Sequence, residues 1–236
     1  MRDGPVGANR EVARLIEGRR RNSPAGGRNH QRCAPGSKAV PSPRSADGGK
    51  DKEGKVQAMI SVIVGPMFSG KSTELLRRLE RAKIAGKTVA LVRPETDTRP
   101  QLTHNKTRVV IEPLFLPSLD FFDPSGYNVI GVDEGQFFPD LVKYANEYAA
   151  MGAHVIVTGL PLTSELQPFN SIVALLPFAE DILRLNAICA RCGSEYGAFT
   201  HYKAGRKTQD VLVGGIDLYD SLCRECYLKT CAENGL

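Results

Sequence analysis

An eight-residue stretch at positions 65–72 constrains the fold more than any other part of the chain. It reads GPMFSGKS, fills the pattern G-x-x-x-x-G-K-[ST], and lies between the apolar run 59–64 and an amphipathic pattern at 71–85. A loop that wraps a polyphosphate turns backbone N–H groups inward, and glycine tolerates the conformations that this needs. The sequence therefore predicts a strand–loop–helix unit that binds a nucleoside triphosphate. Its loop residues are Gly65, Pro66, Met67, Phe68, Ser69, Gly70, Lys71 and Ser72.

Two carboxylates at the end of another apolar run complete the predicted phosphate site. Asp133 and Glu134 follow residues 129–132, and open α/β sheets place ligand-binding groups at the carboxyl ends of their strands. Lys71 would reach the β- and γ-phosphates, and the Ser72 hydroxyl would bind Mg²⁺. We expect Asp133 to act on the metal through a coordinated water, because Mg²⁺ keeps several of its waters. Glu134 is then expected to accept the proton of an attacking hydroxyl, as the catalytic base.

The remaining pattern indicates a parallel sheet. Short β-branched runs alternate with helical patterns from residue 59 onward. Residues 114–126 are harder to assign, since prolines and a glycine interrupt their apolar residues. Strands are expected at 59–64, 88–92, 129–134, 153–159 and 182–188, and helices at 71–85 and 139–151.

Two C-x-x-C pairs near the C-terminal end predict a structural zinc site. Four thiolates leave no open coordination position, so the ion would fasten a loop and do no chemistry. The thirty residues between the pairs are expected to form a long lid clamped at its base. A disulfide or redox role is the weaker alternative. The four predicted ligands are Cys189, Cys192, Cys223 and Cys226.

These patterns divide the chain into three parts. We predict a disordered basic tail at 1–57, a P-loop nucleotide-binding α/β domain at 58–187, and a zinc-binding lasso subdomain at 188–236. The predicted fold class is α/β, of the P-loop NTPase type, with a mainly parallel sheet flanked by helices and a small zinc-anchored lasso.

The excess of basic residues lies in the expected tail. Residues 1–55 contain thirteen of the 31 lysines and arginines but six of the 26 acidic residues. The rest of the chain is therefore slightly acidic, which argues against a nucleic-acid-binding surface there. No stretch is apolar enough to cross a bilayer. We expect a soluble cytoplasmic protein, with organelle targeting by the arginine-rich tail as the weaker alternative, because Asp3, Glu11 and Glu17 are atypical of a transit peptide.

The ordered motifs together resemble the cytosolic, zinc-containing type of thymidine kinase. Besides the phosphate loop and the cysteines, they are the DTR run at 97–99, GVDEGQFF at 131–138, and VGG at 213–215 followed by Tyr219. The resemblance implies transfer of the ATP γ-phosphoryl group to the 5′-hydroxyl of thymidine, with Mg²⁺, structural Zn²⁺ and Glu134 as the base. It adds to the ATP-binding loop the residues Asp97, Thr98, Arg99, Asp133 and Gln136.

The resemblance also implies a base pocket beneath the lasso. It further implies a homotetramer and feedback inhibition by dTTP. The pocket-lining positions are Met67, Phe137, Leu160, Thr163, Ser164 and Phe169, and the lasso positions are Asp210, Val211, Leu212, Val213 and Gly214, with Tyr219 behind them.

One segment departs from the family pattern. After the strand expected at 153–159 the family has a run similar to Asp-Gly-Thr-Phe, whereas this chain reads LPLTSEL at 160–166. Ser164 falls where an aromatic ring would stack on the base, and losing such a platform costs about 1–3 kcal/mol of base binding. The segment near Lys203, the expected basic group of the phosphate side, is also altered in spacing. The nucleobase preference is therefore the part of the prediction that the resemblance leaves open.

Two other functions are weighed against the kinase. The first is a P-loop ATPase whose zinc ribbon and basic tail bind nucleic acid. The second is a catalytically weakened relative with an altered base preference, which Pro161 and Ser164 suggest.

Overall fold

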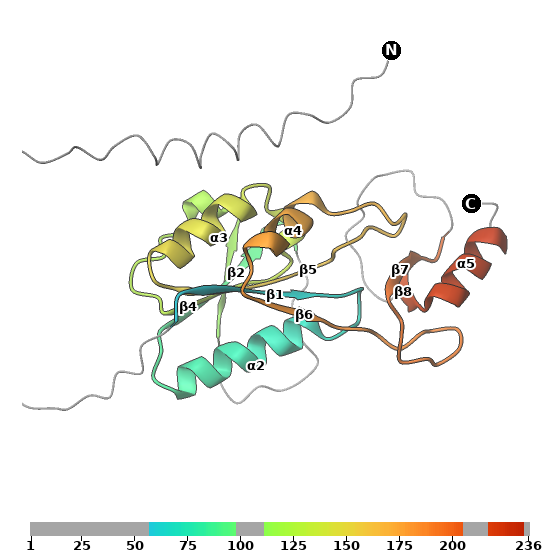
Figure 1. Ribbon diagram of the computed structural model, residues 1–236, viewed down its shortest axis with the longest axis horizontal. Coiled ribbons are helices and arrows are strands. Elements are labelled where there is room, and N and C mark those ends of the chain that lie inside the picture. Colours follow the sequence, from blue (N-terminus) through green and yellow to red (C-terminus); the bar gives the residue numbers. More distant parts are fainter. Residues whose placement is uncertain (1–56, 98–110, 205–216, 234–236) are drawn as a thin grey trace, which may run out of the picture. The chain divides into compact units, whose positions relative to one another are not determined.

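The computed structural model describes residues 57–97, 111–204 and 217–233, and its largest element is a six-stranded sheet (Figure 1). The strand order is β3-β2-β4-β5-β1-β6, and all neighbouring strands are parallel. The predicted α/β class with a mainly parallel sheet is confirmed. The strands are β1 Met59–Val64, β2 Val89–Pro94, β3 Pro113–Leu116, β4 Val129–Val132, β5 His154–Gly159 and β6 Asp181–Arg184.

Helices cover both faces of this sheet. Helix α2 (Lys71–Ile84) lies on one face, and α3 (Leu141–Ala150) and α4 (Asn170–Leu175) lie on the other (Figure 1). Successive side chains of a strand point to opposite faces, so Ile60 and Val62 pack with the α3 and α4 side, while Ile63 packs with the leucines of α2. Because both faces are buried, the strands read as nearly continuous apolar runs.

Close packing of α2 against β4 depends on a glycine. A Cβ at Gly131 would lie 2.7 Å from Leu79 Cδ1 and 3.1 Å from Leu75 Cδ1. Both leucines are fully buried on the sheet side of α2. The missing side chain in β4 therefore lets the helix that follows the phosphate loop lie directly on the sheet.

The C-terminal part contains a second, two-stranded sheet, and this region is called the cysteine ribbon. It consists of the segment from Ala187 to the antiparallel pair β7 (Phe199–Tyr202) and β8 (Tyr219–Leu222), and helix α5 (Arg224–Glu233). Its buried apolar cluster has four members: Cys189, Phe199, Leu222 and Tyr227. The segment between the cysteine pairs, expected to form a long lid clamped at its base, is not loop throughout, because β7 and β8 lie within it. Residues 205–216 are outside the described part of the chain.

Several boundaries differ from the sequence predictions for local reasons. Residues 114–126, left unassigned, contain most of edge strand β3 and the 3₁₀ turn η2 (Leu119–Phe121). The strand expected at 182–188 ends at Arg184. Helix α4 runs into the 3₁₀ turn η4 (Leu176–Phe178). With six residues, α4 is too short for a helical period to be recognised in the sequence. Within the described ranges no helix is long and apolar enough to cross a membrane.

Candidate functional site

The predicted phosphate loop joins β1 to α2 and is folded around one of its own carbonyl groups. Lys71 Nζ and Ser69 Oγ donate to Pro66 O at 2.7 and 2.8 Å. Gly70 directly precedes the first turn of α2 and has a φ of +82°, a conformation that residues with a side chain rarely adopt. A Cβ on Gly65 would lie 2.5 Å from the backbone oxygen of Leu185, so only glycine fits there. The loop therefore has the compact turn and the buried lysine that a polyphosphate site requires.

The structure brings the two predicted magnesium-side residues into direct contact. Ser72 Oγ donates to Asp133 Oδ1 at 3.0 Å, and Thr158 Oγ1 donates to the same oxygen at 2.5 Å. Asp133 is buried, and its Oδ2 accepts no hydrogen bond from the described residues. Burial and the charge of Glu134 raise the pKa of Asp133, while the two hydroxyls and Arg93 oppose this rise. A buried acceptor oxygen of this kind fits a carboxylate that a bound cation would complete.

A buried arginine connects this carboxylate to a second one. Arg93 on β2 contacts Asp97 at 2.6 Å, and its Nε lies 3.9 Å from Asp133 Oδ2. The guanidinium is 2% exposed and lies 5.3 Å from the ring centre of Phe115. Asp97, Asp133 and Glu134 offer oxygens that all lie within 4.8 Å of one another. The predicted ATP-side residue Asp97 is thus part of the same acidic cluster, held by an arginine that the sequence analysis did not single out.

Glu134 directly follows Asp133 and is held in an uncommon backbone conformation. Its φ is +53°, a left-handed value that is rare outside glycine, at the start of the turn η3 (Gly135–Phe137). Gln136 Nε2 donates to Glu134 Oε2 at 2.6 Å, while Gln136 Oε1 accepts from the Leu160 N–H at 3.1 Å. Gln136, expected on the ATP side, therefore links the proposed base to the first residue of the altered 160–166 segment.

The segment between β5 and α4 forms a tight hairpin-like loop. Leu162 and Pro168 form an antiparallel bridge, and Thr163 N–H donates to Gln167 O at 2.8 Å. Ser164 is 8% exposed, and its hydroxyl donates to Glu165 at 2.8 Å. The position at which the family resemblance implies an aromatic ring is therefore occupied here by a small buried side chain.

The other predicted site residues are spread over several elements. Phe137 lies in η3, and Phe169 is the residue before α4. Tyr219 begins β8, where it is buried against Tyr202 with ring centres 5.5 Å apart. Lys203 is exposed just beyond β7. The positions outside the described residues are Thr98, Arg99, Asp210, Val211, Leu212, Val213 and Gly214.

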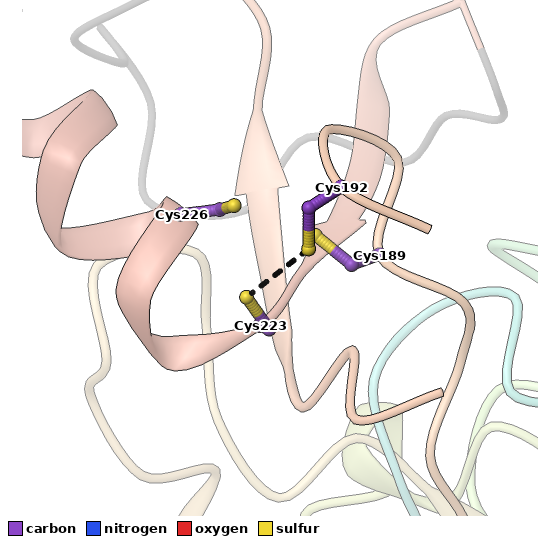
Figure 2. Close-up of side chains that lie close together, drawn as sticks. All are labelled: Cys189, Cys192, Cys223 and Cys226. Carbon is purple, nitrogen blue, oxygen red and sulfur yellow. Dashed lines mark hydrogen bonds between the residues drawn. The ribbon is translucent and has the colours of Figure 1, made fainter. Parts of the chain in front are cut away.

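The four paired cysteines converge at the base of the ribbon, as Figure 2 shows. Their sulfurs all lie within 4.8 Å of one another, and Cys192 Sγ is 3.7 Å from Cys223 Sγ. In a tetrahedral site with Zn–S bonds of about 2.3 Å, neighbouring sulfurs lie about 3.8 Å apart. None of the described cysteines forms a disulfide. The cluster is therefore compatible with zinc.

Burial, mutual proximity and backbone N–H groups shift the pKa values of these thiols in opposite directions. Burial would raise the pKa of Cys189, but backbone N–H groups of Cys223, Cys192 and Arg191 outweigh it and lower the pKa to about 6. Burial and the neighbouring cysteines raise the pKa of Cys226 to about 12. Four thiols this close do not all ionise unless a cation joins them, since their negative charges repel.

Several residues that no sequence motif singles out also lie at the site. Arg93 and Thr158 are polar residues inside otherwise apolar strands, and that irregularity was a usable signal. Thr200 and Ser221 bond the phosphate loop, and Tyr227 bonds the 160–166 segment, through contacts between residues far apart in the chain. No local pattern marks such contacts.

Comparison with known proteins agrees with this geometry. The family model described as thymidine kinase matches residues 58–227. The chain is 41% identical over 176 residues to the thymidine kinase of variola virus, covering 72% of this chain and 97% of the viral protein. It is 40% identical over 178 residues to human cytosolic thymidine kinase and 39% identical over 180 residues to the chicken form, covering 74% and 75% of this chain and 75% and 80% of those proteins. With its parallel sheet, phosphate loop and cysteine cluster, the chain belongs to the thymidine kinase family.

Proposed function

We propose that this chain transfers the γ-phosphoryl group of ATP to the 5′-hydroxyl of thymidine. The observation that carries the proposal is the position of Glu134, which directly follows Asp133, the carboxylate bonded to Ser72 of the phosphate loop. Family membership supports thymidine as the acceptor. The site thus combines a triphosphate loop, a buried metal-side carboxylate and a second carboxylate beside it.

Each of these groups has a definite part in phosphoryl transfer. Lys71 would leave its contact with Pro66 O to bind the β- and γ-phosphates. Ser72 and Asp133 would hold Mg²⁺, which supplies charge neutralisation at the phosphate oxygens when it is bound. Glu134 accepts the proton of the 5′-hydroxyl as the sugar oxygen bonds to the γ-phosphorus and ADP leaves. Gln136, bonded to Glu134 and Leu160, would orient this base toward the nucleoside.

The remaining groups extend this proposal to binding. Asp97 and Arg99 would complete the ATP side, and residues 210–214 would cover the base. A zinc ion on the four cysteines would anchor that cover. We further propose from the family that the protein is cytoplasmic, forms a homotetramer and is inhibited by dTTP.

The kinase is favoured over a nucleic-acid-stimulated ATPase. The family assignment covers both the phosphate loop and the cysteine ribbon, so the ribbon belongs to the kinase architecture. A weakened relative with altered base preference is motivated by one specific observation: Ser164 is small and buried where the family has an aromatic ring.

A panel of the four natural deoxynucleosides with ATP and Mg²⁺ tests the proposal. We expect thymidine 5′-monophosphate and ADP to form in a 1:1 ratio. ADP release without any deoxynucleoside monophosphate, stimulated by DNA, would favour the ATPase. Faster phosphorylation of another deoxynucleoside would keep the phosphate chemistry and replace the proposed substrate.

A further inference from the structure

Two hydroxyls of the cysteine ribbon bond both polar backbone groups of one phosphate-loop residue. Met67 N–H donates to Thr200 Oγ1 at 3.0 Å, and Ser221 Oγ donates to Met67 O at 2.6 Å. Thr200 and Ser221 are directly opposite each other in the β7–β8 pair, and their exposed fractions are 5% and 2%. A cross-strand pair therefore fixes the orientation of the Met67 peptide groups.

A third hydroxyl of the ribbon bonds the nucleoside side. Tyr227 OH donates to Ser164 O at 2.6 Å in a buried position. Tyr227 follows Cys226 on α5, and its ring lies 5.4 Å from that of Phe199 on β7. The ring is thus held by the ribbon's small apolar cluster while its hydroxyl bonds a different part of the chain.

These contacts tie two separate substrate sites to one small unit. Met67 belongs to the loop between β1 and α2, and Ser164 belongs to the loop between β5 and α4. Both Ser221 and Tyr227 lie within four residues of a cysteine of the cluster. A carbonyl in a buried or part-buried position that loses a side-chain donor has to move, bond water or stay unsatisfied, so either change would shift the loop that carries it.

We propose that Ser221 and Tyr227 are positioning residues for the two substrates: Ser221 sets the phosphate loop for ATP, and Tyr227 sets the 160–169 segment for the nucleoside. The cysteine ribbon then holds both substrate loops in place through Ser221 and Tyr227, a role that we call the bracket. It also anchors the residues between β7 and β8. This inference depends on the proposed function, because it assigns each loop to one substrate.

Steady-state kinetics of two conservative variants separate these roles. We expect Ser221→Ala to raise the KM for ATP about five- to tenfold and the KM for thymidine by a clearly smaller factor, because the bond holds the backbone of Met67 in the phosphate loop, whereas the side chain of Met67 is the part expected in the base pocket. Tyr227→Phe should do the reverse. In both variants kcat and the zinc content per chain should stay within twofold. The matched controls are Ser125→Ala, in an exposed loop, and Tyr196→Phe, whose ring is 72% exposed.

Two results would overturn the proposal. One is that neither variant changes either KM by more than twofold. The other is that each variant raises both KM values together and loses zinc, which would indicate general loosening of the ribbon. If the wild-type protein phosphorylates no deoxynucleoside, the proposed function fails, whereas the bracket can still be tested.

Hydrogen exchange of the wild-type protein gives that independent test and needs no variant to fold. The Met67 amide should be protected to the same degree as the amides of β8, because Thr200 accepts its hydrogen bond. Exchange of the Met67 amide at the rate of an exposed loop would contradict the bracket.

Discussion

The carboxyl edge of the sheet and the cysteine ribbon hold their functional groups by different means. At the sheet edge, Ser72, Asp133 and Arg93 belong to or directly follow elements that pack into the two apolar clusters of the sheet. Among its described residues, the ribbon has one cluster of four buried residues, and its four sulfurs lie within 4.8 Å of one another. A core this small rarely stabilises a unit without a metal or a disulfide. The sheet edge is therefore preorganised by its own packing, whereas we propose that the ribbon depends on a metal ion held by its four cysteines.

This difference assigns the two regions different tasks. The chemistry of phosphoryl transfer needs groups fixed to within a fraction of an ångström, which buried networks on strands provide. The ribbon contacts the two substrate loops through the hydroxyls of Thr200, Ser221 and Tyr227, so a change in the ribbon should alter substrate binding more than the chemical step. The predictions below probe this separation.

The largest effect on stability is expected at the buried arginine of the sheet edge. Arg93→Ala leaves two buried carboxylates, Asp97 and Asp133, without their cation and should destabilise the protein by about 3–5 kcal/mol in urea unfolding. Arg93→Lys keeps a positive charge and should cost less. An Arg93→Ala protein within 1 kcal/mol of wild type would show that the network does not hold this edge.

Effects of intermediate size are expected from matched glycine substitutions, one in the sheet and one in the ribbon. Gly131→Ala places a Cβ 2.7 Å from Leu79 Cδ1 and should lower the global free energy of unfolding by about 1–3 kcal/mol. Gly197→Ala places a Cβ 2.7 Å from Ala187 O in the ribbon. We expect it to reduce hydrogen-exchange protection in the ribbon alone. If Gly197→Ala lowered protection in β1 and β5 as well, the two regions would form one cooperative unit.

Removal of the metal should have the smallest effect on the sheet. A chelator should remove the hydrogen-exchange protection of β7, β8 and α5. It should also raise the KM values for ATP and thymidine about five- to tenfold, because the hydrogen bonds to Met67 and Ser164 weaken. The far-UV circular dichroism of the sheet and its helices should persist. Unchanged substrate affinity after zinc loss would contradict the anchoring role of the cysteines.

The sequence predicted the parts of the structure that depend on local patterns. The phosphate loop, the strand before Asp133 and the cysteine pairs each have a fixed spacing, because one turn or one ion needs those residue types at those distances. Edge strand β3 was obscured by prolines, and α4 is shorter than the period that would reveal it.

The contacts that join the regions could not be predicted. Ser221 and Met67 are 154 residues apart, and the sequence around a serine in a short strand does not predict its hydrogen-bond partner. The role of Arg93 could have been predicted, since a charged residue inside an apolar strand needs buried counter-charges. Its partner Asp97 was identified for the phosphate site, but the pairing itself depended on the fold.

The most direct test of the central claim is a single-turnover measurement of phosphoryl transfer by Glu134→Gln beside wild type. The variant keeps the size of the side chain but cannot accept the 5′-hydroxyl proton, so the rate of thymidine 5′-monophosphate formation should fall about 10²- to 10⁴-fold while ATP binding is retained. Transfer at the wild-type rate by Glu134→Gln would contradict the assignment of this carboxylate as the base.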